Sequence, residues 1–349
     1  MEQFKSILKS KKIDIALFFS LDYMNYNPNM VYFCGYKGLG ALAIPKSKEP
    51  FLIVPRMEVQ RAKKSGIKVY SMEKKRFFEE LKKVIKKPKT VGIEKRTITL
   101  SSYKHFKKQF KKIRIKDISE ACHIIRQIKT EKEINFLKKS CHEADKILQK
   151  TIKKFKTFKT ESEAAAFLEY ETKKQGLELS FNPIVASGSN GSMPHHEPAN
   201  VKIKKGFCVI DFGVKYKGYC SDITRTIYVG KPTKKEVNTY NFLLEIQKDT
   251  INQVKQNKKC SELYDFVNTS LGKDKKYFTH GLGHGVGVEI HELPNLTLNS
   301  KDRIKNNMVF TIEPGLYFPK KFGIRIEDTV LFKNKPILLT KTTKDLLIV

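Results

Sequence analysis

The feature that most constrains this 349-residue chain is a set of acidic residues and histidines at positions where an isolated charge is unfavourable. Basic residues outnumber acidic ones by 68 to 36, yet several C-terminal segments place a carboxylate or an imidazole beside glycines or inside an apolar strand. Burying a charge at such a position is unfavourable unless it is paired or bound to a metal ion. The fold must therefore bring compensating charges to these segments.

Two aspartates flank a predicted hairpin in residues 209–226, VIDFGVKYKGYCSDITRT. If the hairpin turns about Tyr216 and Lys217, Asp211 and Asp222 are direct cross-strand partners on one face of the sheet. Two facing carboxylates repel each other, so this register favours a cation between them. Either aspartate taken alone would be better explained as a residue that caps or ends a strand.

Three histidines lie within residues 280–292, HGLGHGVGVEIHE. The four glycines between His280 and His291 exclude a stable helix, so this is not the helical HExxH arrangement of zinc proteases. Glycines instead allow the backbone to approach a site closely and leave room for a ligand. A single histidine is usually structural, but three in one short segment indicate a binding or metal site.

Two further acids interrupt strand-like segments, Glu313 in residues 309–315 (VFTIEPG) and Glu327 in residues 323–329 (GIRIEDT). Arg325 and Glu327 lie two positions apart and therefore share one face of their strand. Glu313 joins them if the two strands pair across the turn at residues 317–321. Glu313 alone is also compatible with a plain strand end before Pro314.

The rest of the chain predicts two domains, residues 1–122 and 123–349. Residues 1–122 alternate short helices and apolar strands, which indicates an α/β domain with a largely parallel sheet. Behind the boundary, capping-box patterns predict helices that begin at Thr130 and Thr160. The later segments have short strands and glycine-containing turns, typical of an α+β domain.

The net charge of +32 raises the possibility of nucleic-acid binding, but only nine of the 68 basic residues are arginine. The lysines are scattered along the chain, so we expect a solvated basic surface, no specific nucleic-acid site and no membrane association. Six cysteines without CxxC spacing fit reduced thiols. No signal peptide or membrane span is predicted, and we expect a cytoplasmic protein.

Taken together, these motifs resemble the pita-bread metallopeptidase family, in particular its Xaa-Pro aminopeptidase (aminopeptidase P) and prolidase branch. The resemblance covers the whole chain and implies a creatinase-like α/β N-terminal domain followed by an α+β pita-bread catalytic domain. It also implies five metal ligands in sequence order: Asp211, Asp222, His284, Glu313 and Glu327.

The same resemblance suggests roles for the residues around the metal. The family pattern places a histidine directly after a proline in the loop ASGSNGSMPHH, which selects His195 over His196. The residues expected to be catalytic are His195, His291, Glu313 and Arg325. Those expected to bind substrate are His195, His280, His291 and Arg325.

The resemblance implies two divalent ions and hydrolysis of the Xaa-Pro bond by attack of a hydroxide that bridges them. Oxygen-rich ligands with one histidine favour Mn²⁺, with Co²⁺ and Zn²⁺ as alternatives. The expected substrate is a proline-containing peptide, cleaved by an aminopeptidase or a dipeptidase. The alternatives are a creatinase-like amidinohydrolase and a pita-bread-fold binding protein without peptidase activity.

For the N-terminal domain we expect an architectural role. In this branch the domain commonly helps to form a homodimer and borders the mouth of the active site. Residues 25–40 are rich in Tyr, Asn and Gly and suit a loop that lines a peptide site, although a plain strand–turn–strand connection is equally compatible.

Overall fold

The computed structural model describes residues 1–22, 26–73 and 77–349. It divides into an N-terminal unit, Met1–Ile125, and a C-terminal unit, Arg126–Val349. The division falls within helix α6 (Ser119–Gln127), which also contains the expected boundary at residue 122. The start of the helix predicted at residues 74–86 and the first residue of the segment 25–40 lie outside the described residues.

The N-terminal unit contains a six-stranded sheet in the order β4-β3-β2-β1-β5-β6. Its strands are β1 (Ile15–Ser20), β2 (Gly40–Pro45), β3 (Phe51–Pro55), β4 (Lys68–Met72), β5 (Thr90–Ile93) and β6 (Arg114–Asp117). The expectation of a largely parallel sheet is wrong for β2, which runs antiparallel to both β1 and β3. The link from β2 to β3 spans only residues 46–50, too short for the crossover that a parallel pair requires.

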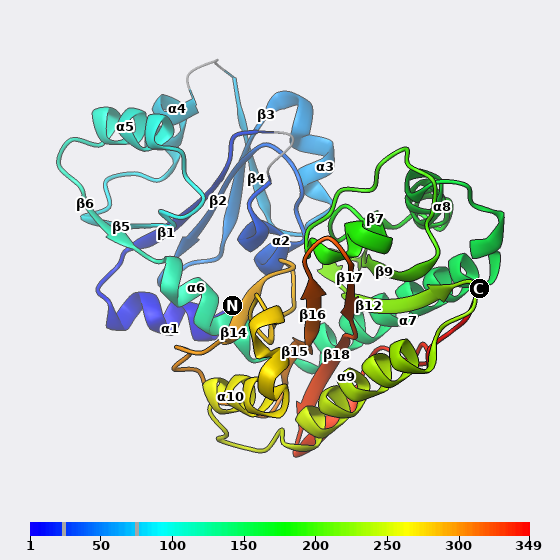
Figure 1. Ribbon diagram of the computed structural model, residues 1–349. Coiled ribbons are helices and arrows are strands. Elements are labelled where there is room, and N and C mark those ends of the chain that lie inside the picture. The colour runs from blue at the N-terminus through cyan, green and yellow to red at the C-terminus, as the bar shows by residue number, and fades with distance from the viewer. Residues whose placement is uncertain (23–25, 74–76) are drawn as a thin grey trace. The chain divides into compact units, whose positions relative to one another are not determined.

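Helices cover both faces of this sheet (Figure 1). One face carries α1 (Glu2–Ser10), α2 (Pro28–Cys34), α3 (Val59–Lys63) and α6, and the other carries α4 (Phe77–Val84) and α5 (Leu100–Gln109). Along β1, Ala16 and Phe18 join the first core, whereas Ile15, Leu17 and Phe19 join the second. Burial on both faces explains why β1 reads as a continuous apolar run.

Helix α2 occupies part of the segment 25–40, for which the sequence suggested either a loop that lines a peptide site or a plain strand–turn–strand connection. Asn27 caps the helix by accepting a hydrogen bond from the Asn29 N–H, Pro28 is its first residue, and Gly35 ends it with φ of 68°. These are ordinary helix start and stop signals. The expected loop is therefore wrong for residues 28–34.

The C-terminal unit is built from antiparallel strand pairs. One sheet has the order β12-β9-β8, formed by β8 (Ile184–Ser187), β9 (Gly206–Phe212) and β12 (Ile223–Val229). A second sheet has the order β14-β13-β15-β18-β19, formed by β13 (Gly283–Gly285), β14 (Glu292–Leu296), β15 (Met308–Ile312), β18 (Asp328–Lys333) and β19 (Lys335–Leu338). A hairpin of β16 (Gly315–Phe318) and β17 (Phe322–Arg325) lies between β15 and β18 in the chain.

Two pairs of helices cover these strands (Figure 1). Helices α7 (Glu131–Lys154) and α8 (Glu161–Lys174) pack on β8, β9 and β12, whereas α9 (Lys234–Asn252) and α10 (Cys260–Ser270) share a core with β15 to β18. The capping box predicted at Thr130 is present, and Thr160 caps α8. Among the described residues, no helix has the length and apolar character needed to cross a membrane.

The predicted register of the aspartate hairpin is wrong by two positions. In the structure Tyr216 pairs with Tyr219 across a turn at Lys217 and Gly218, and Asp211 pairs with Thr224. Both turn residues have positive φ, 48° and 87°, as a two-residue hairpin turn of the favoured type requires. The glycine sets the turn, so Asp222 lies two residues from the position opposite Asp211.

Candidate active site

A pocket of about 420 Å³ in the C-terminal unit gathers the site residues that the sequence predicted. Those found on its wall are His195, Asp211, Asp222, His280, His284, His291, Glu313, Arg325 and Glu327. They come from segments that are far apart in the chain, and strand pairing brings the segments together.

Strands and their ends position the five expected metal ligands. Asp211 lies within β9 and His284 within β13, whereas Asp222, Glu313 and Glu327 lie just outside the ends of β12, β15 and β18. Antiparallel pairing of β9 with β12, and of β13 and β18 with β15, aligns these positions. The site is therefore carried by strands rather than by long loops.

The ligand atoms of Asp222, His284 and Glu327 all lie within 4.8 Å of one another. His284 Nε2 is 3.5 Å from Asp222 Oδ2 and 3.4 Å from Glu313 Oε1. Two donors that each lie about 2.1 Å from one ion are separated by roughly 3 to 3.5 Å. The spacing thus matches donors that share a cation.

The electrostatics of the carboxylates also fit a cation. Burial, followed by the negative charges of neighbouring acids, raises the pKa of Asp222 and of Glu327 well above the ordinary range. Two buried oxygens, Asp211 Oδ1 and Glu327 Oε1, have no hydrogen-bond partner among the described residues. A divalent ion would remove the repulsion and satisfy the oxygens, so the residues present fit a metal.

Backbone carbonyls set the orientation of two histidines. His284 Nδ1 is 3.1 Å from the carbonyl oxygen of Gly285, and His280 Nδ1 is 2.7 Å from that of Gly281. Donation from Nδ1 leaves the Nε2 of His284 free to bind a metal ion. Burial lowers the pKa of both histidines to about 4, so both are neutral at pH 7.

Arg325 connects the carboxylate cluster to the loop that carries His195. It is 3% exposed, and its guanidinium donates to Asp211 Oδ2 at 2.7 Å, Tyr317 Oη at 2.8 Å and the Pro194 carbonyl at 3.2 Å. Tyr317 Oη also lies 2.8 Å from His280 Nε2. Sequence reasoning missed Tyr317, because nothing local distinguishes it from the other tyrosines of the chain.

A buried carboxylate anchors the loop that bears His195. Glu161 is fully buried at the start of α8 and accepts hydrogen bonds from Ser187 and Asn190, and its Oε2 lies 2.7 Å from His196 Nε2. Burial alone would raise the pKa of Glu161, but these hydrogen bonds outweigh burial and lower it. His196 is thereby tied to Glu161, whereas the neighbouring His195 is exposed at the pocket.

His291 is exposed at the pocket and packs edge-on against His284, with ring centroids 4.3 Å apart. Burial and the nearby His195 lower its pKa. The next residue, Glu292, is buried and lies 2.9 Å from Lys129 Nζ. This ion pair joins the His291 segment to the start of α7.

The sequence predicted that the glycine-rich backbone approaches a neighbouring segment closely, and Gly283 does so. A Cβ atom there would collide with the Thr311 carbonyl on β15. Strand β13 can therefore lie against β15, which places His284 beside Glu313. Thr311 reinforces this arrangement, since its hydroxyl donates to Glu313 Oε1 at 3.2 Å.

Comparison with known proteins agrees with this geometry. The model of metallopeptidase family M24 matches residues 135–334, and that of the creatinase/prolidase N-terminal domain matches residues 1–128. The chain belongs to metallopeptidase family M24. It is therefore a hydrolase of a family that uses divalent metal, and the expected pita-bread catalytic domain behind a creatinase-like domain is confirmed.

Similar proteins cover nearly the whole chain. An Xaa-Pro dipeptidase of Pyrococcus furiosus is 39% identical over 91% of this chain and 92% of its own length. The structure of a prolidase from Pyrococcus horikoshii OT3 is 34% identical, covers 99% of each chain and has a TM-score of 0.90. That of an X-Pro aminopeptidase from Thermotoga maritima MSB8 is 29% identical, covers 98% of this chain and 100% of its own, and has a TM-score of 0.89.

Proposed function

We propose that this chain is a metal-dependent peptidase that hydrolyses the Xaa-Pro bond of proline-containing peptides. The observation that carries the proposal is the cluster of four carboxylates and one histidine in a pocket that also holds Arg325 and four further histidines. Relatives named Xaa-Pro dipeptidase and X-Pro aminopeptidase support the choice of substrate.

In this proposal Asp211, Asp222, His284, Glu313 and Glu327 hold two divalent ions. The four carboxylates supply a charge of −4, which two divalent cations neutralise. Mostly oxygen donors favour Mn²⁺, with Co²⁺ and Zn²⁺ as alternatives. When bound, the ions would polarise the scissile carbonyl and lower the pKa of an attacking water.

The chain's own residues would bind the peptide and move protons. Glu313 lies at the edge of the cluster, where its carboxylate can take a proton from the attacking water and pass it to the proline nitrogen. His195 and His291, both exposed at the pocket, would donate hydrogen bonds to the carbonyl oxygen as negative charge develops on it. His280 and Arg325 would bind the substrate and hold its scissile bond next to the metal ligands.

Proline suits this arrangement because an Xaa-Pro bond is a tertiary amide without an N–H. Peptidases that must bind the N–H of the scissile bond therefore cannot recognise an Xaa-Pro bond in that way. Activation of the carbonyl does not require that N–H. The proline nitrogen must still be protonated as it leaves, which is the second task of Glu313.

The alternatives receive less support. A binding protein without activity would not need a complete ligand set in a pocket, and a creatinase-like amidinohydrolase would not need the metal. Related proteins include both dipeptidases and aminopeptidases, so the length of the peptide substrate is part of the proposal to be tested. We further propose a homodimer.

Metal removal tests the function directly. Exhaustive chelation should abolish hydrolysis of an Xaa-Pro peptide, and added Mn²⁺ or Co²⁺ should restore it. Rates on an Xaa-Pro dipeptide and on an Xaa-Pro-Yaa-Zaa tetrapeptide would separate dipeptidase from aminopeptidase. Full activity in a metal-free preparation would refute the proposal.

A further inference from the structure

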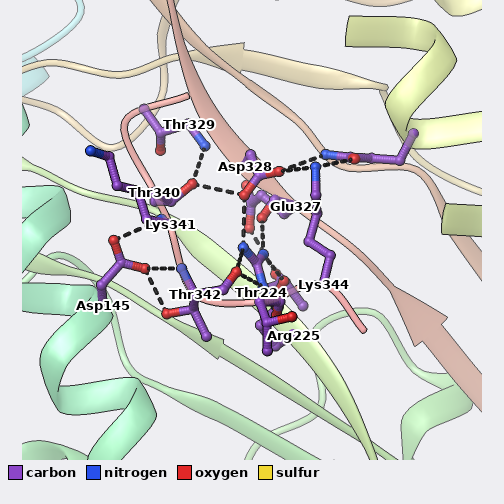
Figure 2. Close-up of polar contacts among 12 residues, drawn as sticks. Asp145, Thr224, Arg225, Glu327, Asp328, Thr329, Thr340, Lys341, Thr342 and Lys344 are labelled. Atoms are coloured by element: carbon purple, nitrogen blue, oxygen red, sulfur yellow. Dashed lines mark hydrogen bonds and ion pairs between the residues drawn. The ribbon is translucent and has the colours of Figure 1, made fainter. Parts of the chain in front are cut away.

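A segment near the C-terminus, residues 340–344, lies behind the expected metal ligand Glu327 (Figure 2). It has no regular secondary structure and follows the end of the family match at residue 334. Buried hydrogen bonds nevertheless tie it to β12, to β18 and to α7. These bonds indicate a defined role for the segment, which we call the C-terminal strap.

Arg225 joins the strap to the metal site. This arginine on β12 is 2% exposed. Its Nε donates to the carbonyls of Thr342 and Thr343 at 3.1 and 3.0 Å, and one terminal nitrogen donates to the Thr342 carbonyl at 2.7 Å. The other terminal nitrogen donates to the Thr224 carbonyl at 2.9 Å and to the carbonyl of Glu327 itself. The planar guanidinium thus fixes the backbone of Glu327 relative to the strap.

Asp328, the residue after Glu327, is the second junction. Its fully buried carboxylate accepts from Arg225 and from Lys344 Nζ, each at 2.8 Å. It also accepts from Thr340 Oγ1 at 2.9 Å and from Gln247 Nε2 at 3.0 Å. Figure 2 shows Arg225, Thr340 and Lys344 around Asp328.

Asp145 on α7 holds the other side of the strap. Its carboxylate accepts from the backbone N–H groups of Lys341 and Thr342, both at 2.8 Å, and from the Thr342 hydroxyl at 2.6 Å. Asp145 is 4% exposed. The strap is therefore clamped between a helix and the strands of the site.

The carboxylate of Glu327 is held as firmly as its backbone. Oε2 accepts from the Thr224 hydroxyl at 2.7 Å, whereas Oε1 is buried without a hydrogen-bond partner among the described residues. One oxygen is thus fixed by the protein, and the other remains available to a cation. Fixing the carbonyl of Glu327, the side chain of Asp328 and one oxygen of the Glu327 carboxylate sets the direction in which Oε1 points.

We propose that Arg225 and the C-terminal strap are positioning elements that hold Glu327 in the geometry required for metal binding. The inference rests on the metal centre proposed above. Stability alone does not explain the network, because buried ion pairs can often be replaced by apolar groups without loss of stability. In contrast, replacing a residue that is hydrogen-bonded to a metal ligand commonly lowers metal affinity by about 10–100-fold.

Two substitutions in the full chain test the proposal. Arg225→Lys keeps the positive charge but loses the planar fork. Thr342→Val, at almost constant volume, removes the hydroxyl that donates to Asp145 and accepts from Gln149 Nε2. Thr151→Val is the matched control, since Thr151 is buried on α7 and donates only to the carbonyl of Ile147. Each protein is stripped of metal, and its affinity for Mn²⁺ is measured by calorimetry together with its thermal unfolding without metal.

We expect Arg225→Lys to bind Mn²⁺ about 10–100-fold more weakly. Thr342→Val should show a smaller loss in the same direction, and Thr151→Val should keep the original affinity. A purely structural role would lower the unfolding temperature and leave the affinity unchanged, and that result would overturn the inference. If Arg225→Lys does not fold, Thr342→Val and Asp145→Asn decide the question in the same way. Absence of Mn²⁺ binding by the unchanged chain would refute the metal centre itself.

Discussion

Asp222 and His291 line the same pocket, but we expect their replacement to affect different steps. Asp222→Asn removes a negative charge from the proposed ligand set and should lower activity through loss of bound metal. His291→Ala should keep the metal and lower kcat by about 10²–10³, because the imidazole would stabilise charge that develops in the transition state. Elemental analysis of both purified variants checks this. An equally metal-poor His291→Ala would show that His291 supports the metal site instead.

Glu161 gives a second prediction at the scale of one residue. Glu161→Gln replaces a carboxylate oxygen with an NH₂ group that faces hydrogen-bond donors, which should destabilise the fold at pH 7 by about 1–3 kcal/mol. The exposed Glu169→Gln on the same helix is the control and should have little effect. Denaturant unfolding of the three proteins provides the measurement.

The pH dependence of this loss follows from the lowered pKa of Glu161. A carboxylate whose pKa is lower in the folded state stabilises the fold above its ordinary pKa, near 4.5. That contribution is lost as the pH falls below 4.5 toward the folded-state pKa. The stability difference between the unchanged chain and Glu161→Gln should therefore shrink below pH 4.5. A constant difference would mean that the charge of Glu161 does not matter.

Site residues could be predicted where the neighbouring sequence marks them as unusual. Residues whose role depends on partners far away in the chain were missed. An acid or a histidine among glycines signals a site wherever it occurs, so the motif residues could be named in advance. Thr224 and Glu161 carry no such signal. Thr224 acquires a role only through Arg325 and Glu327, 101 and 103 positions away, and Glu161 only through a loop that begins 26 positions later.

At the scale of elements, one ion pair fixes the start of α7 to β14. Lys129 is 1% exposed, and its Nζ lies 2.9 Å from the buried carboxylate of Glu292. Lys129→Met should destabilise the chain by about 3–5 kcal/mol, because it leaves a buried acid without one of its cationic partners. Within α7, Lys139→Met breaks a pair with Glu143 in which the lysine is largely exposed, and should cost at most about 0.5 kcal/mol.

Thermal and urea unfolding of the two methionine variants measure this difference. The Lys129 variant should also show weaker peptide hydrolysis, since Glu292 follows His291 directly in the chain. Equal stability of the two variants would mean that Arg126, whose Nε lies 3.4 Å from Glu292 Oε1, suffices to balance that carboxylate.

Elements with local signals could be predicted well, and strand pairing could not. The start of α7 follows from Thr130 and Glu133, which cap each other within one turn. Strand pairing in the aspartate hairpin was predicted wrongly, because the prediction placed the turn midway between Asp211 and Asp222 so that the two acids would face each other. Gly218 can adopt a positive φ at low cost, and this preference fixed the turn one residue later.

At the scale of the whole molecule, the N-terminal unit has its own two-sided core, and none of its described residues lines the pocket. We therefore expect it to act in assembly and in substrate selection rather than in chemistry.

A chain that lacks residues 1–125 but retains Arg126 and Lys129 should still bind Mn²⁺, because the proposed ligands belong to the C-terminal unit. It should cleave Xaa-Pro peptides poorly or without preference for length, and sedimentation should show a monomer, whereas we expect the full chain to be a dimer. Metal titration, rates on the dipeptide and the tetrapeptide, and sedimentation of both chains give the comparison. If the shortened chain kept the specificity and the oligomeric state of the full chain, the N-terminal unit would neither select the substrate nor assemble the protein.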